Sequence, residues 1–200
     1  EKFARYTRGI SLIRKLDDRI IDGIASGPTR EYLGHYHAIN AELDAVCTAA
    51  DGLARAGIEA LPFQATKSDY ELDENGNSLL RSSLSHKMVA TRAGLGWIGK
   101  TDLLVTRRFG TRVRLASILL ADPAIATGTA CAESLCGSCR RCVEACPAAA
   151  ATGLAWRAGM EREEFFDAHA CRRNCLAVSE RMLQETISIC GICVAVCIWD

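Results

Sequence analysis

Cysteines dominate the last third of the chain, where they form two runs with regular spacing. Written out, these runs are Cys136, Cys139, Cys142 and Cys146 followed by Pro147, and then Cys190, Cys193 and Cys197. The first run has the C-x2-C-x2-C-x3-C-P spacing by which bacterial ferredoxins bind [4Fe–4S] clusters through thiolates. In two-cluster ferredoxins the fourth cysteine of such a run ligates the other cluster. The two runs therefore predict two four-iron cubes with crossed ligands.

This crossing assigns seven of the eight thiolates that two cubes need. One cluster is expected to use the first three cysteines of the first run and the last cysteine of the second run: Cys136, Cys139, Cys142 and Cys197. The other cluster is expected to use the three cysteines that remain in the runs: Cys146, Cys190 and Cys193. Its fourth thiolate must come from the segment between the runs, which offers Cys171 and Cys175.

Two structural alternatives compete with this interpretation. Tetrahedral zinc held by four cysteines is one, because C-x2-C pairs also occur in zinc ribbons. A disulfide framework is the other. Four cysteines at this spacing, ending in a proline, exceed what either alternative requires, so the pattern favours iron–sulfur clusters.

Composition limits the remaining choices. The chain has 200 residues, of which 49% are hydrophobic, enough for one compact domain with an attached cluster module. Its 24 basic and 24 acidic residues cancel, so the net charge points neither to nucleic acid nor to an anionic membrane. Only Cys47 lies in the first 130 residues, which favours thiolate clusters in a reducing cytosol over a secreted disulfide scaffold. Because no apolar run has the length of a membrane span and the start shows no signal-peptide core, we expect a cytoplasmic protein with no membrane contact.

The region before the cysteines predicts alternating strands and helices. Apolar residues favour a strand at 9–14, and residues 17–27 are expected to form a connection. A periodic apolar stripe then predicts a helix that begins at Pro28 and is capped by Gly57. The stripe consists of Tyr32, Tyr36, Ile39, Leu43, Val46 and Ala50. A strand at 58–63 contains a proline and should lie at a sheet edge.

Leu84, Met88 and Ala93 have roughly helical spacing and predict a helix, after which a second group of strands follows. Residues 103–106 and 113–121 predict a hairpin, and the second strand is so apolar that it should occupy the sheet centre. The Ala/Thr/Gly-rich segment 124–130 then reads as a linker. We therefore predict two domains, an α/β domain with a glycine-loop ligand site at 1–123 and a double-cluster domain at 124–200.

A glycine loop with the pattern G-x-G-x-x-G lies between these elements, at Gly94, Gly96 and Gly99. A dinucleotide-binding loop leaves a strand and opens a helix, whereas here a helix precedes the glycines and a strand follows them. The glycines indicate either close approach of a ligand or tight packing, and the sequence leaves both open. Trp97 favours a flat ligand surface. The candidate binding residues are Gly94, Gly96, Trp97, Gly99 and Lys100.

The same loop also carries a family resemblance. The stretch 93–100 (AGLGWIGK), the strand after it, RVRLA at 112–116 and the first cysteine run resemble the epoxyqueuosine reductase family. The later stretches FDAHAC, ending at Cys171, and CGICVAVC, ending at Cys197, continue the resemblance in order. Reductive dehalogenases are similar in plan. The resemblance implies an α+β fold, with a mixed-sheet domain like those of cobalamin-processing proteins followed by a two-[4Fe–4S] ferredoxin-like module.

The resemblance also implies cofactors and partners. In the family, cobalamin lies between the two parts and the clusters feed it electrons, so we expect two [4Fe–4S] clusters, a cobalamin site at the glycine loop, and a low-potential donor such as a ferredoxin or flavodoxin. Cys171 holds the position of the family's additional cysteine ligand. Cys175 and Cys131 are then spare.

Two departures from the family bear on the substrate. Leu80 stands where the family has the acidic residue proposed as proton donor to the epoxide, and an aliphatic side chain cannot deliver a proton. The chain also ends soon after the second cysteine run, without the helical-repeat extension that some members use for tRNA. We therefore expect a related reductase that acts on a small-molecule or corrinoid substrate, not on epoxyqueuosine or nucleic acid.

Two functional classes remain at this point. The first is a reductive enzyme in which the clusters pass single electrons to a cobalamin or a substrate, with His86 or Lys100 delivering protons. The second is a ferredoxin-like electron carrier or cluster-bearing partner protein that has no substrate of its own.

Overall fold

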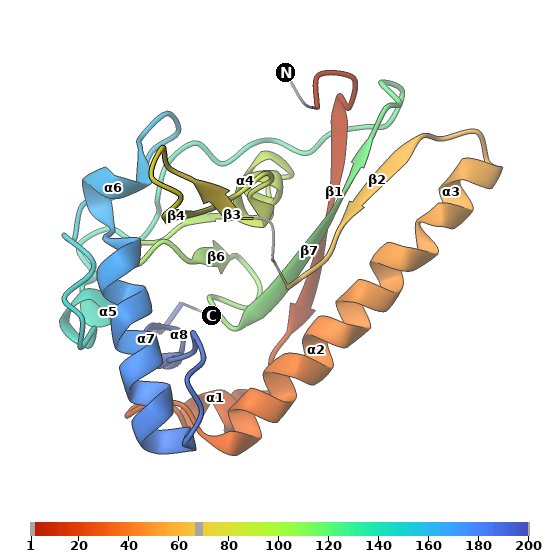
Figure 1. The fold of residues 1–200 in the computed structure, drawn as a ribbon. Helices are drawn as coiled ribbons and strands as arrows, with labels where there is room; N and C mark the ends of the chain where they lie inside the picture. Colours follow the sequence, from red (N-terminus) through yellow and green to blue (C-terminus); the bar gives the residue numbers. More distant parts are fainter. Residues whose placement is uncertain (1–2, 67–69, 200) are drawn as a thin grey trace.

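Residues 3–66 and 70–199 are described by the structure, a computed structural model. Its main sheet is antiparallel and has the order β1-β7-β2 (Figure 1). The strands are β1 (Arg8–Lys15), β7 (Val113–Leu120) and β2 (Ala60–Phe63). The last five residues of β7 are buried, as a strand paired on both sides requires, so its predicted central position is confirmed. β2, which contains Pro62, is an edge strand as predicted.

A long helix, α2 (Arg30–Ala49), runs along the main sheet (Figure 1). Thr29 caps its N-terminus by accepting a hydrogen bond from the Tyr32 amide at 3.1 Å. The predicted stripe is largely buried, but Val46 is 52% exposed and its neighbour Cys47 takes the inward position. The helix also ends earlier than predicted, and the short α3 (Asp51–Arg55) follows it.

The stretch 17–27, predicted as a connection, contains a helix of its own, α1 (Asp18–Asp22). The Asp17 side chain accepts a hydrogen bond from the Arg19 amide at 2.8 Å and so caps this helix. Ile21 and Ile24 are completely buried, which explains why so short a segment is ordered.

The predicted hairpin between 103–106 and 113–121 is wrong. β6 (Leu104–Thr106) pairs instead with β5 (Gly96–Ile98), while β7 pairs with β1 and β2. Thr106 and Gly110 exchange backbone hydrogen bonds of 2.8 and 3.1 Å, which closes a tight loop before β7 begins. β7 then pairs with β1 along the full length of both strands, from Val113 opposite Lys15 to Leu120 opposite Arg8.

A small hairpin and a helix precede β5. The hairpin consists of β3 (Tyr70–Leu72) and β4 (Ser78–Ser82), joined through a turn that includes Asn75 and Gly76. The predicted helix before the glycines is α4 (His86–Arg92), capped by Ser85. The cysteine-rich part then contributes α5 (Arg141–Glu144), α6 (Arg162–Phe165), α7 (Ala168–Leu183) and α8 (Ile192–Ala195).

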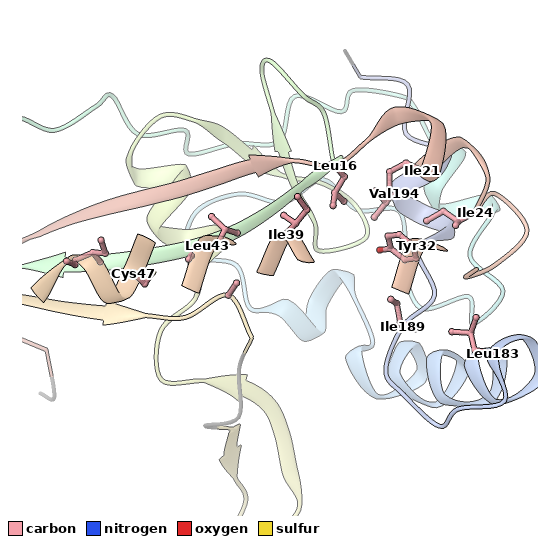
Figure 2. Close-up of a cluster of buried hydrophobic side chains, with 14 of the residues drawn as sticks. Leu16, Ile21, Ile24, Tyr32, Ile39, Leu43, Cys47, Leu183, Ile189 and Val194 are labelled. Carbon is pink, nitrogen blue, oxygen red and sulfur yellow. The ribbon is translucent and has the colours of Figure 1, made fainter. Parts of the chain in front are cut away.

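The main hydrophobic core includes residues from both ends of the chain. Figure 2 shows Ile21, Ile24 and Tyr32 gathered beside Val194, with Leu183 and Ile189 on the other side of Tyr32. A second core, around Ile98, Trp156 and Phe165, joins β5 to the cysteine-rich part. The division at residues 123 and 124 stays a prediction, and residues on both sides of it share each core.

Among the helices formed by residues 3–66 and 70–199, none combines the length and the apolar character that a membrane span requires.

Candidate metal centres and the adjoining cavity

Five cysteines line a cavity of about 280 Å³ next to the β5–β6 hairpin. Four of them form the first thiol group and are the four predicted for one cluster, Cys136, Cys139, Cys142 and Cys197, whereas the fifth, Cys193, was predicted for the other cluster. Burial raises the pKa of the Cys142 thiol, and the neighbouring thiols of the other three residues of the first group act in the same direction. Iron would reverse this effect, because a coordinating thiol is deprotonated outright. The structure therefore brings together thiols from both cysteine runs.

The remaining predicted thiols form a second group. Burial raises the pKa of Cys193, and the thiols of Cys171, Cys190, Cys142 and Cys146 add to this effect. One more thiol joins this group, since the Sγ atoms of Cys175 and Cys171 are 4.0 Å apart. The second group thus contains the predicted Cys146, Cys171, Cys190 and Cys193, together with Cys175.

The other two cysteines lie apart from both groups. Cys131 Sγ is 4.0 Å from an Arg107 nitrogen, and Cys47 Sγ is 3.5 Å from the Phe63 carbonyl oxygen in the core of the α/β part. Within the described residues, no three His, Cys, Asp or Glu side chains are arranged to hold a single metal ion. The donor set fits clusters that are ligated by thiolates at their corners: the four thiols of the first group line one cavity, and Cys193, which lines it too, belongs to a second group of thiols.

The turn between β5 and β6 positions the first thiol group. Lys100 is 5% exposed, and its Nζ donates hydrogen bonds of 2.8 Å to the carbonyl oxygens of Gly137 and Cys139. The next residue, Thr101, forms a hydrogen bond with Cys142 that opposes the rise in its pKa. On the strand before the turn, Trp97 Nε1 donates to Cys136 Sγ at 3.4 Å. The sequence marked Lys100 and Trp97 as ligand-binding residues, and the structure places both against the cysteine loop.

Tight packing accounts for the glycines of this loop. A Cβ atom at Gly96 would lie 2.1 Å from the Val105 carbonyl oxygen, and one at Gly94 would lie 2.5 Å from that of Thr129. At Gly99 it would lie 2.9 Å from a Val105 side-chain carbon. Trp97 is completely buried. The sequence left open whether the glycines allow a ligand to approach or the backbone to pack tightly. The structure favours tight packing, because Val105 and Thr129 lie where the missing side chains would be.

A larger cavity of about 580 Å³ lies between the α/β part and the cysteine-rich part. One side of its lining comes from β4, α4 and β7, and the other from 156–165. None of the five predicted cofactor-binding residues lines this cavity, whereas the predicted catalytic residue His86 does. The His86 ring is held between Ser117 Oγ and the Gln64 carbonyl oxygen, both at 2.9 Å. Leu103 and Thr111 line this cavity and also the cavity of the first thiol group.

An ion pair that the sequence did not indicate lies in the wall of the larger cavity. Lys87 Nζ is 2.5 Å from Asp102 Oδ2, and the two side chains are 30% and 16% exposed. The Asp102 carboxylate also lies near Cys171, where it opposes a lowering of that thiol's pKa. Residues 100–102 therefore contact both thiol groups and the wall of the larger cavity. The sequence could not predict these contacts, because they depend on where the turn between β5 and β6 lies in the fold.

Leu80, which the family resemblance matched to the position of an acidic residue, also lines the larger cavity. Its backbone is left-handed, with φ +53°, a conformation that is uncommon outside glycine and favours Asn and Asp among other residues. Arg162 holds this backbone by donating from Nη1 to the Leu80 carbonyl oxygen at 2.7 Å. The side chain at position 80 is therefore presented to the cavity on a fixed backbone.

Comparisons with known proteins agree with the cysteine pattern. Residues 135–200 match the model of the 4Fe-4S double cluster binding domain family. Over 96 residues the chain is 38% identical to the epoxyqueuosine reductase of Listeria monocytogenes, a match that covers 48% of this chain and 22% of that protein. The matched stretch therefore spans about a fifth of that relative.

Two solved structures share the fold. A reductive dehalogenase, whose structure suggested a mechanism for B12-dependent dehalogenation, has a TM-score of 0.66 at 17% identity and covers 94% of this chain and 25% of its own. An epoxyqueuosine reductase bound to a tRNA stem loop has a TM-score of 0.50 at 21% identity and covers 79% of this chain and 38% of its own. They confirm the predicted α+β architecture. The chain is thus an iron–sulfur protein similar to the epoxyqueuosine reductases, with a 4Fe-4S double cluster binding domain at residues 135–200.

Proposed function

We propose that this protein is a reductase that passes single electrons through its two clusters to an acceptor in the 580 Å³ cavity. The acceptor is a cobalamin or the substrate itself. The observation that carries the proposal is that Leu103 and Thr111 line both this cavity and the cavity of the first thiol group. A cluster bound there would be separated from the acceptor by one layer of side chains. The clusters, when bound, supply one-electron chemistry at low potential.

The cavity wall supplies charged and titratable groups for the acceptor. His86 is the candidate proton donor because it lines the cavity, and it would deliver a proton when the bond of one ring nitrogen to Ser117 or Gln64 opens; the Lys87–Asp102 pair lies beside it. At the exposed edge, Arg81 forms ion pairs with Glu161 and Glu163, so groups from both parts of the chain close one rim. Lys100, the other candidate from the sequence, is occupied with two carbonyl oxygens of the cysteine loop and is assigned a structural role.

Cobalamin is proposed as the acceptor because one of the dehalogenases that share this fold is described as B12-dependent. The packed glycine loop leaves Trp97 no exposed face, so a corrin ring would have to occupy the cavity instead of the loop. The chain's own contribution is then to bind the ring between its two parts, to exclude water and to hold His86 at the cavity wall.

We further propose a substrate other than epoxyqueuosine. The support is one residue: Leu80 lines the cavity at the position where the family carries its acid, and it cannot donate a proton. The matched relatives bear the name epoxyqueuosine reductase, and one was solved with a tRNA stem loop, so epoxyqueuosine in tRNA is the substrate against which this proposal must be tested.

Anaerobic titration of the reconstituted protein with cobalamin and, separately, with NADH and FAD tests the proposal. We expect a change in the corrinoid absorption spectrum and no nucleotide binding. Met160→Trp, which would fill part of the cavity, should weaken cobalamin binding, whereas Met182→Trp, at a side chain that is 41% exposed, should not. Intact clusters with no cobalamin binding and no substrate reduction would favour an electron carrier instead, and nucleotide binding in the cavity would overturn the cobalamin assignment.

A further inference from the structure

The second thiol group holds one cysteine more than a four-iron cube needs. Cys171 and Cys175 lie four residues apart on α7, so their side chains point to the same face of the helix. Their Sγ atoms are 4.0 Å apart. Five thiols therefore compete for four corners: Cys146, Cys171, Cys175, Cys190 and Cys193.

Cys175 is oriented toward the other ligands. It forms hydrogen bonds with the thiols of both Cys171 and Cys190. Cys175 is 8% exposed, yet it belongs to neither of the two hydrophobic clusters of buried residues. Its burial is therefore directed at the thiol group and not at an apolar core.

We propose that either Cys171 or Cys175 can provide the fourth thiolate of the second [4Fe–4S] cluster. The proposal rests on the double-cluster domain. In the exchange, the incoming Cys175 thiol loses its proton as its sulfur binds iron, and the departing Cys171 thiolate takes up a proton. No electron is gained or lost. Helix α7 can stay in position during this exchange, because the two cysteines lie one turn apart on it and only their side chains need to move.

Three variants test this: Cys171→Ala, Cys175→Ala and the double variant. Iron and acid-labile sulfide are measured after anaerobic reconstitution, and the EPR spectrum of each reduced protein is recorded. We expect each single variant to keep the wild-type iron content and the double variant to lose half of it. The second cluster's EPR signal should differ between the two single variants, because a different side chain closes the cube. Cys131→Ala, at a cysteine outside both groups, is the matched control.

The outcomes separate cleanly. If Cys171→Ala alone halves the iron, Cys175 cannot replace it; if Cys175→Ala alone halves the iron, Cys171 is not sufficient. A double variant with full iron content would mean that neither thiol is a ligand. The first cluster's EPR signal, retained in the double variant, shows that the protein is folded. Failure of the proposed reductase function would leave these iron contents unchanged, so the two proposals can fail independently.

Discussion

Trp97 donates its indole N–H to the sulfur of Cys136 across 3.4 Å, and so links the buried hairpin directly to a predicted ligand of the first cluster. Hydrogen bonds to cluster sulfurs raise the reduction potential because they stabilise the more negative, reduced state. A neutral hydrogen bond is worth about 1 kcal/mol, which for a one-electron couple corresponds to roughly 40 mV.

Trp97→Phe should therefore lower the potential of the first cluster by at most roughly that amount and leave the second cluster unchanged. Redox titration followed by EPR measures both. Trp156→Phe, at a tryptophan that is also buried but packs in the second hydrophobic core, is the control. An unchanged potential in Trp97→Phe would show that the indole N–H does not interact with the cluster.

The crossed arrangement of the thiols predicts which cluster each cysteine serves. Cys146→Ala should damage the cluster held by Cys190 and Cys193, although these residues lie far away in the sequence. Cys197→Ala should instead damage the cluster held by Cys136, Cys139 and Cys142. Wild-type protein should hold about eight irons, and each variant roughly four with one EPR signal surviving. Loss of the cluster nearest in sequence would argue for two independent modules.

Lys100 is expected to stabilise the loop of the first cluster. Lys100→Met removes two charge-assisted hydrogen bonds from a side chain that is 5% exposed and leaves the Gly137 and Cys139 carbonyl oxygens without this donor. We expect the free energy of unfolding to fall by about 2–4 kcal/mol. Lys15→Met, which removes an exposed ion pair with Asp18, should change it by less than about 1 kcal/mol. Equal effects in anaerobic denaturant titrations would contradict the role assigned to Lys100.

Asp167 provides a prediction about pH. Its carboxylate accepts a hydrogen bond from the Ala170 amide at 2.9 Å and caps α7, which holds its pKa below the ordinary value of 3.8. A lowered folded-state pKa adds stability that is fully present above the unfolded-state value and is lost as the pH falls through the folded-state value. Between pH 5 and pH 8 the contribution should thus be constant.

The test of this prediction compares unfolding midpoints of three proteins at pH 5 and pH 8. Asp167→Ala should have a lower midpoint than wild type, by the same amount at both pH values. Asp167→Asn, which keeps a side-chain oxygen at the helix start, should recover most of the loss. A loss that disappears at pH 5 would mean that another titrating group is responsible.

Leu80 leads to a gain-of-function prediction. Wild-type protein should not turn over epoxyqueuosine, and Leu80→Asp should create or increase this activity, because a general acid typically contributes about 10²- to 10⁴-fold. The left-handed backbone at φ +53° suits aspartate better than leucine, so the variant should fold. Leu79→Asp, at the exposed neighbouring residue, is the control. Wild-type turnover comparable with that of a competent homologue would contradict the proposed change of substrate and would direct attention to His86.

The gathering of the cysteines near one another could be predicted from the sequence, because the spacing within each run is local and folding preserves it, whereas the crossed ligation stays a prediction. The central position of β7 followed in the same way from a continuous apolar run. Strand pairing could not be predicted as well, since β6 and β7 are close in sequence but pair with different partners. On α2, a period of 3.6 residues did not distinguish Val46 from Cys47, and only the position of the sheet does.

The glycine loop shows a different limit. Its residue types were compatible with a ligand site and with close packing, and the distances that favour packing involve Val105 and Thr129, whose positions depend on tertiary structure. Asp102 and Lys87 were overlooked for the same reason. Charged residues at a helix start and in a turn are ordinary surface features until the fold places them at a cavity wall.

The packing around Gly191, which lies between two predicted ligands of the second cluster, has a consequence for the lifetime of the protein. A Cβ atom here would lie 2.4 Å from Ile24 and 3.0 Å from Tyr32, so this loop is closely packed against the segment that follows α1 and against the start of α2. Oxygen that destroyed the second cluster would free Cys190 and Cys193, and the loop could no longer hold its place against the main core. We therefore expect loss of iron in air to be followed by susceptibility to proteolysis within the first 40 residues, far in sequence from any cysteine of the clusters.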